Sequence, residues 1–128
     1  MKNFFALILI CLAFGSSIAQ TQSIHLNSLG FLPESSKKAS IVGDAKSFVI
    51  KKTSDQAKVF EGQLSAPIFQ KDVNQSVAIA NFSSFTKSGK YYMETPDGVK
   101  SIEFEISPKA YNQAFYTSMR AFYLAMWC

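Results

Sequence analysis

The residue types that carry most enzyme chemistry are scarce in this sequence of 128 residues. It contains one histidine, His25, and two cysteines, Cys11 and Cys128. A zinc site needs several His, Cys or carboxylate ligands, and Cys–His catalysis needs both partners within reach of each other. The sequence therefore predicts no metal site and no nucleophile–base pair. His25, between Ile24 and Leu26, is expected to be a strand residue at the surface.

Paired carboxylates are the next chemistry to consider, because two of them hydrolyse glycosidic bonds. Glu103 and Glu105 are two residues apart, so on a strand they would share a face at roughly 6–7 Å from each other. A catalytic pair must flank the sugar from opposite sides, which neighbours on one strand face cannot do. We interpret both as residues of a solvated outer face, and we assign no catalytic residue and no cofactor to this sequence.

Aromatic side chains could instead form a platform that binds sugars. The strand-like part of the chain contains Phe31, Phe48, Phe60, Phe69, Phe82, Phe85, Tyr91, Tyr92 and Phe104. Most are phenylalanines that alternate with polar residues, as core positions do. Tyr92 should point opposite to Tyr91, which makes Tyr92 the one candidate for an exposed glycan contact.

The elements that would position these residues are short strands. Between Gln22 and Ile106, strand-like runs are separated by turn residues, and Gly43-Asp44 is a hairpin-type break. In one run Val77 and Ile79 share a face. In the last run Ile102, Phe104 and Ile106 should point one way and Ser101, Glu103 and Glu105 the other. About seven short strands at this spacing, with no helix among them, predict an antiparallel β-sandwich.

One tyrosine has two interpretations. Gly89-Lys90-Tyr91 has the form of a tyrosine corner, in which the Tyr91 hydroxyl would bond back to the backbone near Phe85. Tyr91 could equally be an ordinary half-buried strand residue.

The last part of the sequence predicts a helix. Ser107 suits an N-cap and Pro108 the first helical position. Tyr111, Phe115, Met119, Phe122, Tyr123 and Met126 then follow at the spacing of an apolar helix stripe. Since no stop signal follows, we expect this helix to be the first element of something larger, and its apolar surface to expose a large patch when alone.

The first residues and the charge limit the environment. Met1-Lys2, an apolar run from Phe4 to Phe14 and the Ser17-Ile18-Ala19 site predict a signal peptide over residues 1–19, and hence a secreted or periplasmic protein with no membrane span after cleavage. The net charge is +4, but the lysines are dispersed along the chain. Nucleic-acid binding is therefore not expected, because it needs basic residues clustered on one element.

The order of several motifs resembles the N-terminal immunoglobulin-like domain of family 9 glycoside hydrolases. The segment Ile24 to Pro33 is similar to that domain's opening Asn-Gln-x-Gly-Tyr-x-Pro. Asn81-Phe82-Ser83-Ser84-Phe85 followed by Gly89-Lys90-Tyr91-Tyr92 is similar to its Asp-Phe-Ser and Gly-x-Tyr-Tyr run. The segment from Ser101 to Tyr111 and on to Ala121-Phe122-Tyr123 resembles the join to the catalytic domain.

The resemblance implies a division of the chain and a role. Residues 20–107 would be the immunoglobulin-like sandwich, and 108–128 the first helix of an (α/α)6 barrel that hydrolyses β-1,4-glucan with inversion. No position here matches that barrel's catalytic carboxylates, so the chain would be a non-catalytic support module. Its partner would be its own downstream catalytic domain, through which alone β-glucan is contacted. The residues expected to pack between the domains are Phe115, Met119, Phe122, Tyr123 and Trp127.

An alternative of a different class stays open. The chain could be a free-standing secreted β-sandwich that binds a glycan or a protein, with its last helix as the docking element.

Overall fold

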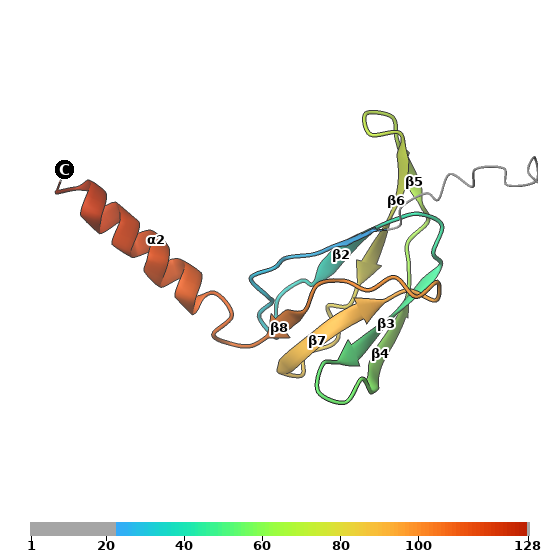
Figure 1. The fold of residues 1–128 in the computed structure, drawn as a ribbon, viewed down its shortest axis with the longest axis horizontal. Helices are drawn as coiled ribbons and strands as arrows, with labels where there is room; N and C mark the ends of the chain where they lie inside the picture. Colours follow the sequence, from blue (N-terminus) through green and yellow to red (C-terminus); the bar gives the residue numbers. More distant parts are fainter. Residues whose placement is uncertain (1–22, 128) are drawn as a thin grey trace, which may run out of the picture.

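The chain folds into two four-stranded antiparallel sheets, and one helix extends away from them (Figure 1). The computed structural model describes residues 23–127. The first sheet contains, in spatial order, β1 (Ser23–His25), β2 (Lys38–Val42), β6 (Gln75–Asn81) and β5 (Ile68–Gln70). The second sheet contains β4 (Lys58–Gln63), β3 (Ser47–Lys52), β7 (Gly89–Glu94) and β8 (Phe104–Ile106). The helix, α2, spans Asn112–Ala125. The predicted immunoglobulin-like sandwich with a C-terminal helix is confirmed.

Aromatic rings fill much of the space between the two sheets. Phe82 is fully buried, and its ring centroid lies 5.3 Å from that of Phe31 and 5.6 Å from that of Phe104. Ring pairs at these distances, edge-on or tilted, stabilise a core beyond the area they bury. The alternation of phenylalanine with polar residues therefore predicted the core well. The exception is Phe69, which is 55% exposed on the edge strand β5.

The buried face of β6 is not the one with the larger side chains. Ala78 and Ala80 are fully buried, whereas Val77 and Ile79 are only half-buried. Ala80 belongs to the same core cluster as the phenylalanines. Because the large rings already occupy the space between the sheets, small side chains complete the packing at β6.

The connection at Gly43 does not make the predicted hairpin. It leads from β2 in the first sheet to β3 in the second, so the two strands are not paired. The Gly43 N–H donates to the carbonyl oxygen of Ser76, 3.1 Å away. The turn residues were recognised correctly, but a turn signal alone does not tell a hairpin from a crossover between sheets.

Tyr91 forms a tyrosine corner. Its ring is buried, and its hydroxyl lies 3.2 Å from the carbonyl oxygens of both Lys87 and Ser88. These acceptors are slightly closer to Tyr91 in the sequence than the position expected near Phe85. Burial raises the pKa of the Tyr91 phenol. Gly89 has a φ of +153°, and a Cβ there would lie 2.9 Å from the Tyr91 hydroxyl oxygen, which explains the Gly-x-Tyr spacing.

Lys37 is fully buried, although lysine is a residue type that is mostly exposed. Its Nζ donates to the carbonyl oxygens of Pro33 and Ser35 at 2.5 and 2.9 Å, and lies 3.4 Å from that of Leu32. Burial lowers the pKa of Lys37, and the Glu34 carboxylate partly opposes this shift. The turn between β1 and β2 is therefore folded around one ammonium group.

Candidate interdomain surface

The loop of residues 27–31 and the segment of residues 105–111 are bonded into one unit, which we call the junction. The Phe31 N–H donates to the Glu105 carbonyl oxygen at 2.8 Å, and the Ser107 N–H donates to the Phe31 carbonyl oxygen at 3.0 Å. These bonds extend the second sheet by a short parallel bridge between Phe31 and Ile106. The chain that leaves β8 toward the helix is thus held against the loop that follows β1.

Asn27 joins the loop to the start of the helix. Its Nδ2 donates to the Gly30 carbonyl oxygen at 3.1 Å and lies 3.2 Å from the Tyr111 hydroxyl. Its Oδ1 accepts the Leu29 N–H at 3.0 Å, which closes the turn in the manner typical of asparagine. Asn27 lies in the segment from Ile24 to Pro33, and no role was predicted for it from the sequence. The pattern Asn-x-x-Gly was the available signal, since such turns place a glycine at positive φ.

Gly30 allows the two parts of the junction to approach closely. Its φ is +99°, and a Cβ at this position would collide with the Glu105 carbonyl oxygen and lie 3.5 Å from the Ala110 Cβ. Only glycine fits both the backbone conformation and the space. The position of the helix relative to the sandwich therefore depends on this residue.

The helix begins later than predicted. α2 starts at Asn112, and its N-cap residue is Tyr111, which makes no side-chain capping bond. Ser107 instead closes a turn: its Oγ accepts the Lys109 N–H and its carbonyl oxygen accepts the Ala110 N–H, both at 3.2 Å. Since the Ser107 N–H is bonded to Phe31, this residue completes the sheet rather than opening the helix.

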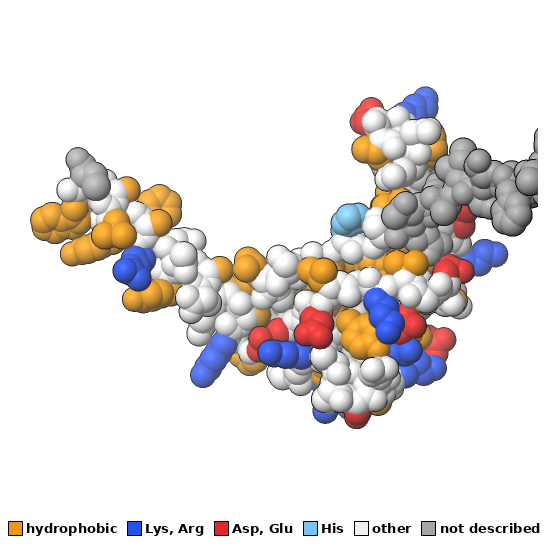
Figure 2. Space-filling model, viewed as in Figure 1, with side chains coloured by type: hydrophobic (Ala, Val, Ile, Leu, Met, Phe, Trp, Pro, Cys, Tyr) orange, Lys and Arg blue, Asp and Glu red, His pale blue; other side chains and the backbone are white. Residues whose placement is uncertain are grey.

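The predicted interdomain residues lie on α2 or directly after it and are all exposed, and hydrophobic side chains gather around this helix (Figure 2). The exposed fractions are 67% for Phe115, 52% for Met119, 70% for Phe122, 61% for Tyr123 and 78% for Trp127. No residue of α2 is buried, and the helix projects from the sandwich without lying on it (Figure 1). An apolar surface of this kind marks a contact site.

The rest of the α2 surface is also poor in charge. A shallow groove beside Phe122 is lined in addition by the small residues Ser118, Ala121 and Ala125. Arg120 is the one charged residue among the fourteen of the helix. A helix that is apolar or small on most of its circumference is typical of a buried element, not of a surface helix. The arrangement can therefore bury α2 on more than one side.

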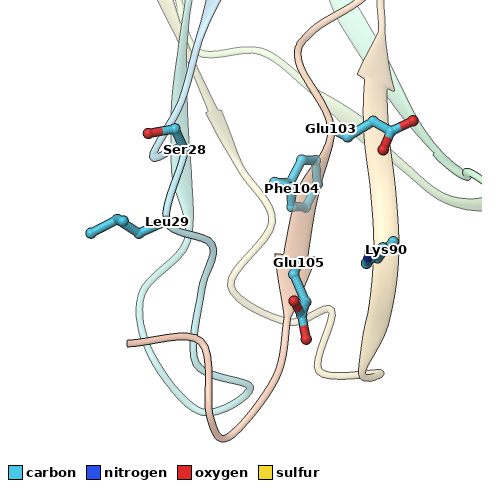
Figure 3. A pocket seen from close by; sticks show the side chains of 6 residues that line it. All are labelled: Ser28, Leu29, Lys90, Glu103, Phe104 and Glu105. Atoms are coloured by element: carbon cyan, nitrogen blue, oxygen red, sulfur yellow. The ribbon is translucent and has the colours of Figure 1, made fainter. Parts of the chain in front are cut away.

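Glu103 and Glu105 lie on the outer surface, as predicted. Both are exposed, and with Ser28, Leu29, Lys90 and Phe104 they line a shallow hollow of about 200 Å³ (Figure 3). The expectation for Ile102 was wrong: it is 55% exposed, because residues 101–103 precede β8 and do not continue its alternation.

Tyr92 points away from the core, but the expected exposure is wrong. Only 8% of Tyr92 is exposed, because the Lys100 ammonium lies over its ring, 5.5 Å from the centroid. His25 is exposed on β1, as predicted, and its Nε2 lies 2.8 Å from the Ser23 hydroxyl.

Residues 23–127 contain no cluster of three or more His, Cys, Asp or Glu side chains placed to hold a metal ion. None of their helices is both long and apolar enough to cross a bilayer. The predicted signal peptide at residues 1–19 and both cysteines lie outside the described part of the chain.

Comparisons with known proteins agree with this architecture. Residues 19–100 match the family model described as the cellulase N-terminal ig-like domain. Endoglucanase D of Acetivibrio thermocellus is 40% identical over 101 residues, which are 79% of this chain and 16% of that protein. Endoglucanase C of Cellulomonas fimi is 31% identical over 104 residues, which are 80% of this chain and 9% of that protein.

A solved structure shows the same fold. The crystal structure of a metagenome-derived glycoside hydrolase family 9 endoglucanase aligns with a TM-score of 0.70 at 26% identity, over 80% of this chain and 21% of that one. The chain spans less than a fifth of the length of the two endoglucanases above. By its sequence motifs, its sandwich and these matches, the chain belongs to the N-terminal immunoglobulin-like domains of family 9 glycoside hydrolases.

Proposed function

We propose that this chain is the non-catalytic support module of a secreted endo-β-1,4-glucanase. Its sandwich holds helix α2 in a fixed direction, and α2 packs into the catalytic domain that follows in the full-length enzyme. β-Glucan would be contacted through that domain, which supplies the catalytic carboxylates. Secretion rests on the signal-peptide pattern of residues 1–19.

The exposed helix is the observation that carries this proposal. Phe115, Phe122 and Trp127 are 67%, 70% and 78% exposed, and no residue of α2 is buried. Leaving such side chains in water costs about 1.5–3 kcal/mol each relative to burial. A partner that covers α2 on more than one side removes this cost, and in the endoglucanases that resemble this chain most of the sequence lies outside the matched region.

The junction explains how the sandwich contributes. Bonds from Asn27 and Phe31 hold the chain that leads into α2, so the helix is presented in one orientation. A docked domain then loses less conformational freedom than one attached through a loose linker. We therefore expect that the sandwich stabilises the catalytic domain only when the junction is intact.

A chimeric enzyme tests the proposal. This chain would replace the matching region of Endoglucanase D of Acetivibrio thermocellus, and the chimera would be compared with the same enzyme lacking that region. We expect the chimera to unfold at a higher temperature and to hydrolyse carboxymethylcellulose. Phe122→Asp should remove most of the gain in melting temperature, whereas Gln113→Asp, an exposed polar control on the same helix, should keep it.

Two outcomes would contradict the proposal. One is the absence of the expected difference in melting temperature, either between the chimera and the enzyme without the region or between Phe122→Asp and Gln113→Asp. The other is release of reducing sugar from carboxymethylcellulose by the 128-residue chain alone, because a support module should not turn over substrate. Retention of a soluble glycan or protein by the isolated chain, with no effect in the chimera, would favour the free-standing binding module instead.

A further inference from the structure

A second hollow lies on the outer face of the second sheet, away from α2. Its volume is about 250 Å³, and it is lined by Thr53, Gln56, Tyr92, Lys100, Ser101 and Glu103. These residues come from the β3–β4 turn, from β7 and from the segment between β7 and β8. Three separate parts of the chain thus meet around one concave site.

Tyr92 forms the apolar wall of this hollow. Tyr91 and Met93, its neighbours in β7, belong to the core cluster, whereas Tyr92 faces outward. The Lys100 ammonium covers the ring, and Lys100 is itself an exposed side chain. Because it is solvated, Lys100 can turn from the ring to a ligand in the hollow without leaving a buried group unpaired.

Several polar groups of the hollow have unused hydrogen-bonding capacity. Within residues 23–127, the side-chain amide of Gln56 and the carboxylate of Glu103 are exposed and bond to no other side chain. Figure 3 shows the Glu103 side chain lying over β7, away from Ser28. Gln56 is also one of two non-glycine residues at positive φ in the described part of the chain, with a value of 58°. Such strain at a cavity is a reason to look for a ligand.

The set of groups indicates the class of ligand. An amide both donates and accepts, a carboxylate accepts, and an ammonium donates, which together match the vicinal hydroxyls of a sugar. The aromatic wall suits the C–H face of a pyranose ring. A charged ligand fits less well, since Glu103 would repel an anion and Lys100 a cation. We propose that this hollow is a subsite for one neutral pyranose unit of a glycan chain.

This proposal does not rest on the support function, because the hollow and α2 share no residue. It is tested by titrating the whole chain with cellohexaose while following backbone amide shifts. We expect saturable binding in the millimolar range, with shifts concentrated at residues 53–56, 92 and 100–103. Glu103→Gln should weaken binding about fivefold through the loss of one charged hydrogen bond.

Gln56→Gly is the decisive variant. It removes the amide but relieves the positive φ, so it should fold at least as stably as the natural chain while binding about fivefold more weakly. Phe69→Ala, which removes an exposed aromatic ring from β5, is the matched control and should bind unchanged. Absence of binding at about 10 mM, equal affinity of Gln56→Gly and the natural chain, or loss of binding in Phe69→Ala would overturn the proposal.

Discussion

Replacing Lys37 by methionine should destabilise the sandwich strongly. The side chain is fully buried, and its ammonium is held by the carbonyl oxygens of Pro33, Ser35 and Leu32. Methionine preserves the length and apolar part of the side chain, so the variant tests the charge and its hydrogen bonds rather than the packing.

The magnitude follows from the three acceptors. A hydrogen bond to a charged group contributes about 1.5–3 kcal/mol, and a buried carbonyl left unpaired costs about 1–3 kcal/mol. Removing the ammonium also removes the cost of burying it, and burial lowers the pKa of Lys37. We therefore expect a net loss of about 3 kcal/mol, below the sum of the individual terms.

Thermal unfolding followed by circular dichroism measures this loss. About 3 kcal/mol corresponds to a fall in melting temperature of about 12–24 °C for a domain of this size. Lys38→Met is the matched control, because Lys38 is the exposed neighbour in sequence and should change the melting temperature by only a few degrees. Equal melting temperatures of Lys37→Met and Lys38→Met would refute the role of the ammonium.

Three further variants test other features. Gly30→Ala should lower the free energy of unfolding in urea by about 3 kcal/mol, because its Cβ meets a β8 carbonyl oxygen. Gly98→Ala is also at positive φ but in open space, and should lower it by only about 1 kcal/mol. Equal losses would contradict the close approach at Gly30. The hydrogen bond from Lys51 lowers the pKa of the Glu94 carboxyl. This ion pair therefore stabilises the fold above pH 4.5, the ordinary pKa of the carboxyl, and the stabilisation is lost as the pH falls through the lowered pKa. Glu94→Gln should reduce this loss in melting curves recorded between about pH 3 and 7, and an unchanged pH profile would refute it. A protein ending at Ser107 should remain in solution at higher concentration than the full chain, and the reverse result would mean that α2 covers the sandwich.

The sequence predicted the features that depend on local pattern. Alternating phenylalanines mark positions such as Phe48 and Phe82, because period-two burial is a property of each strand by itself. The Gly-x-Tyr spacing left two arrangements open for Tyr91, a tyrosine corner or an ordinary strand residue. The structure shows the tyrosine corner. The apolar stripe on α2 was also predicted from local pattern, because its spacing follows the period of a helix.

The features that were not predicted, or were predicted wrongly, involve contacts between distant segments. The core-facing side of β6 was not predicted, because the choice between Ala80 and Ile79 depends on rings contributed by the opposite sheet. Lys37 is buried because the turn folds around it, and nothing in its residue type distinguishes it from an exposed lysine. Tyr92 is covered by Lys100, which follows it at the end of a separate loop. Each of these needs three-dimensional information that pattern analysis lacks.

The junction also has a consequence for the order of folding during synthesis. Asn27 and Tyr111, which bond to each other, are separated by 84 positions in the sequence. The backbone bonds of Phe31 likewise need Glu105 and Ser107, which are synthesised much later. The sandwich therefore cannot close until almost all of it has left the ribosome, and such distant pairing is slow. α2 follows directly, so the next segment to emerge meets a helix that is already anchored. In the proposed full-length enzyme, closure of the junction would therefore precede the packing of α2 into the catalytic domain.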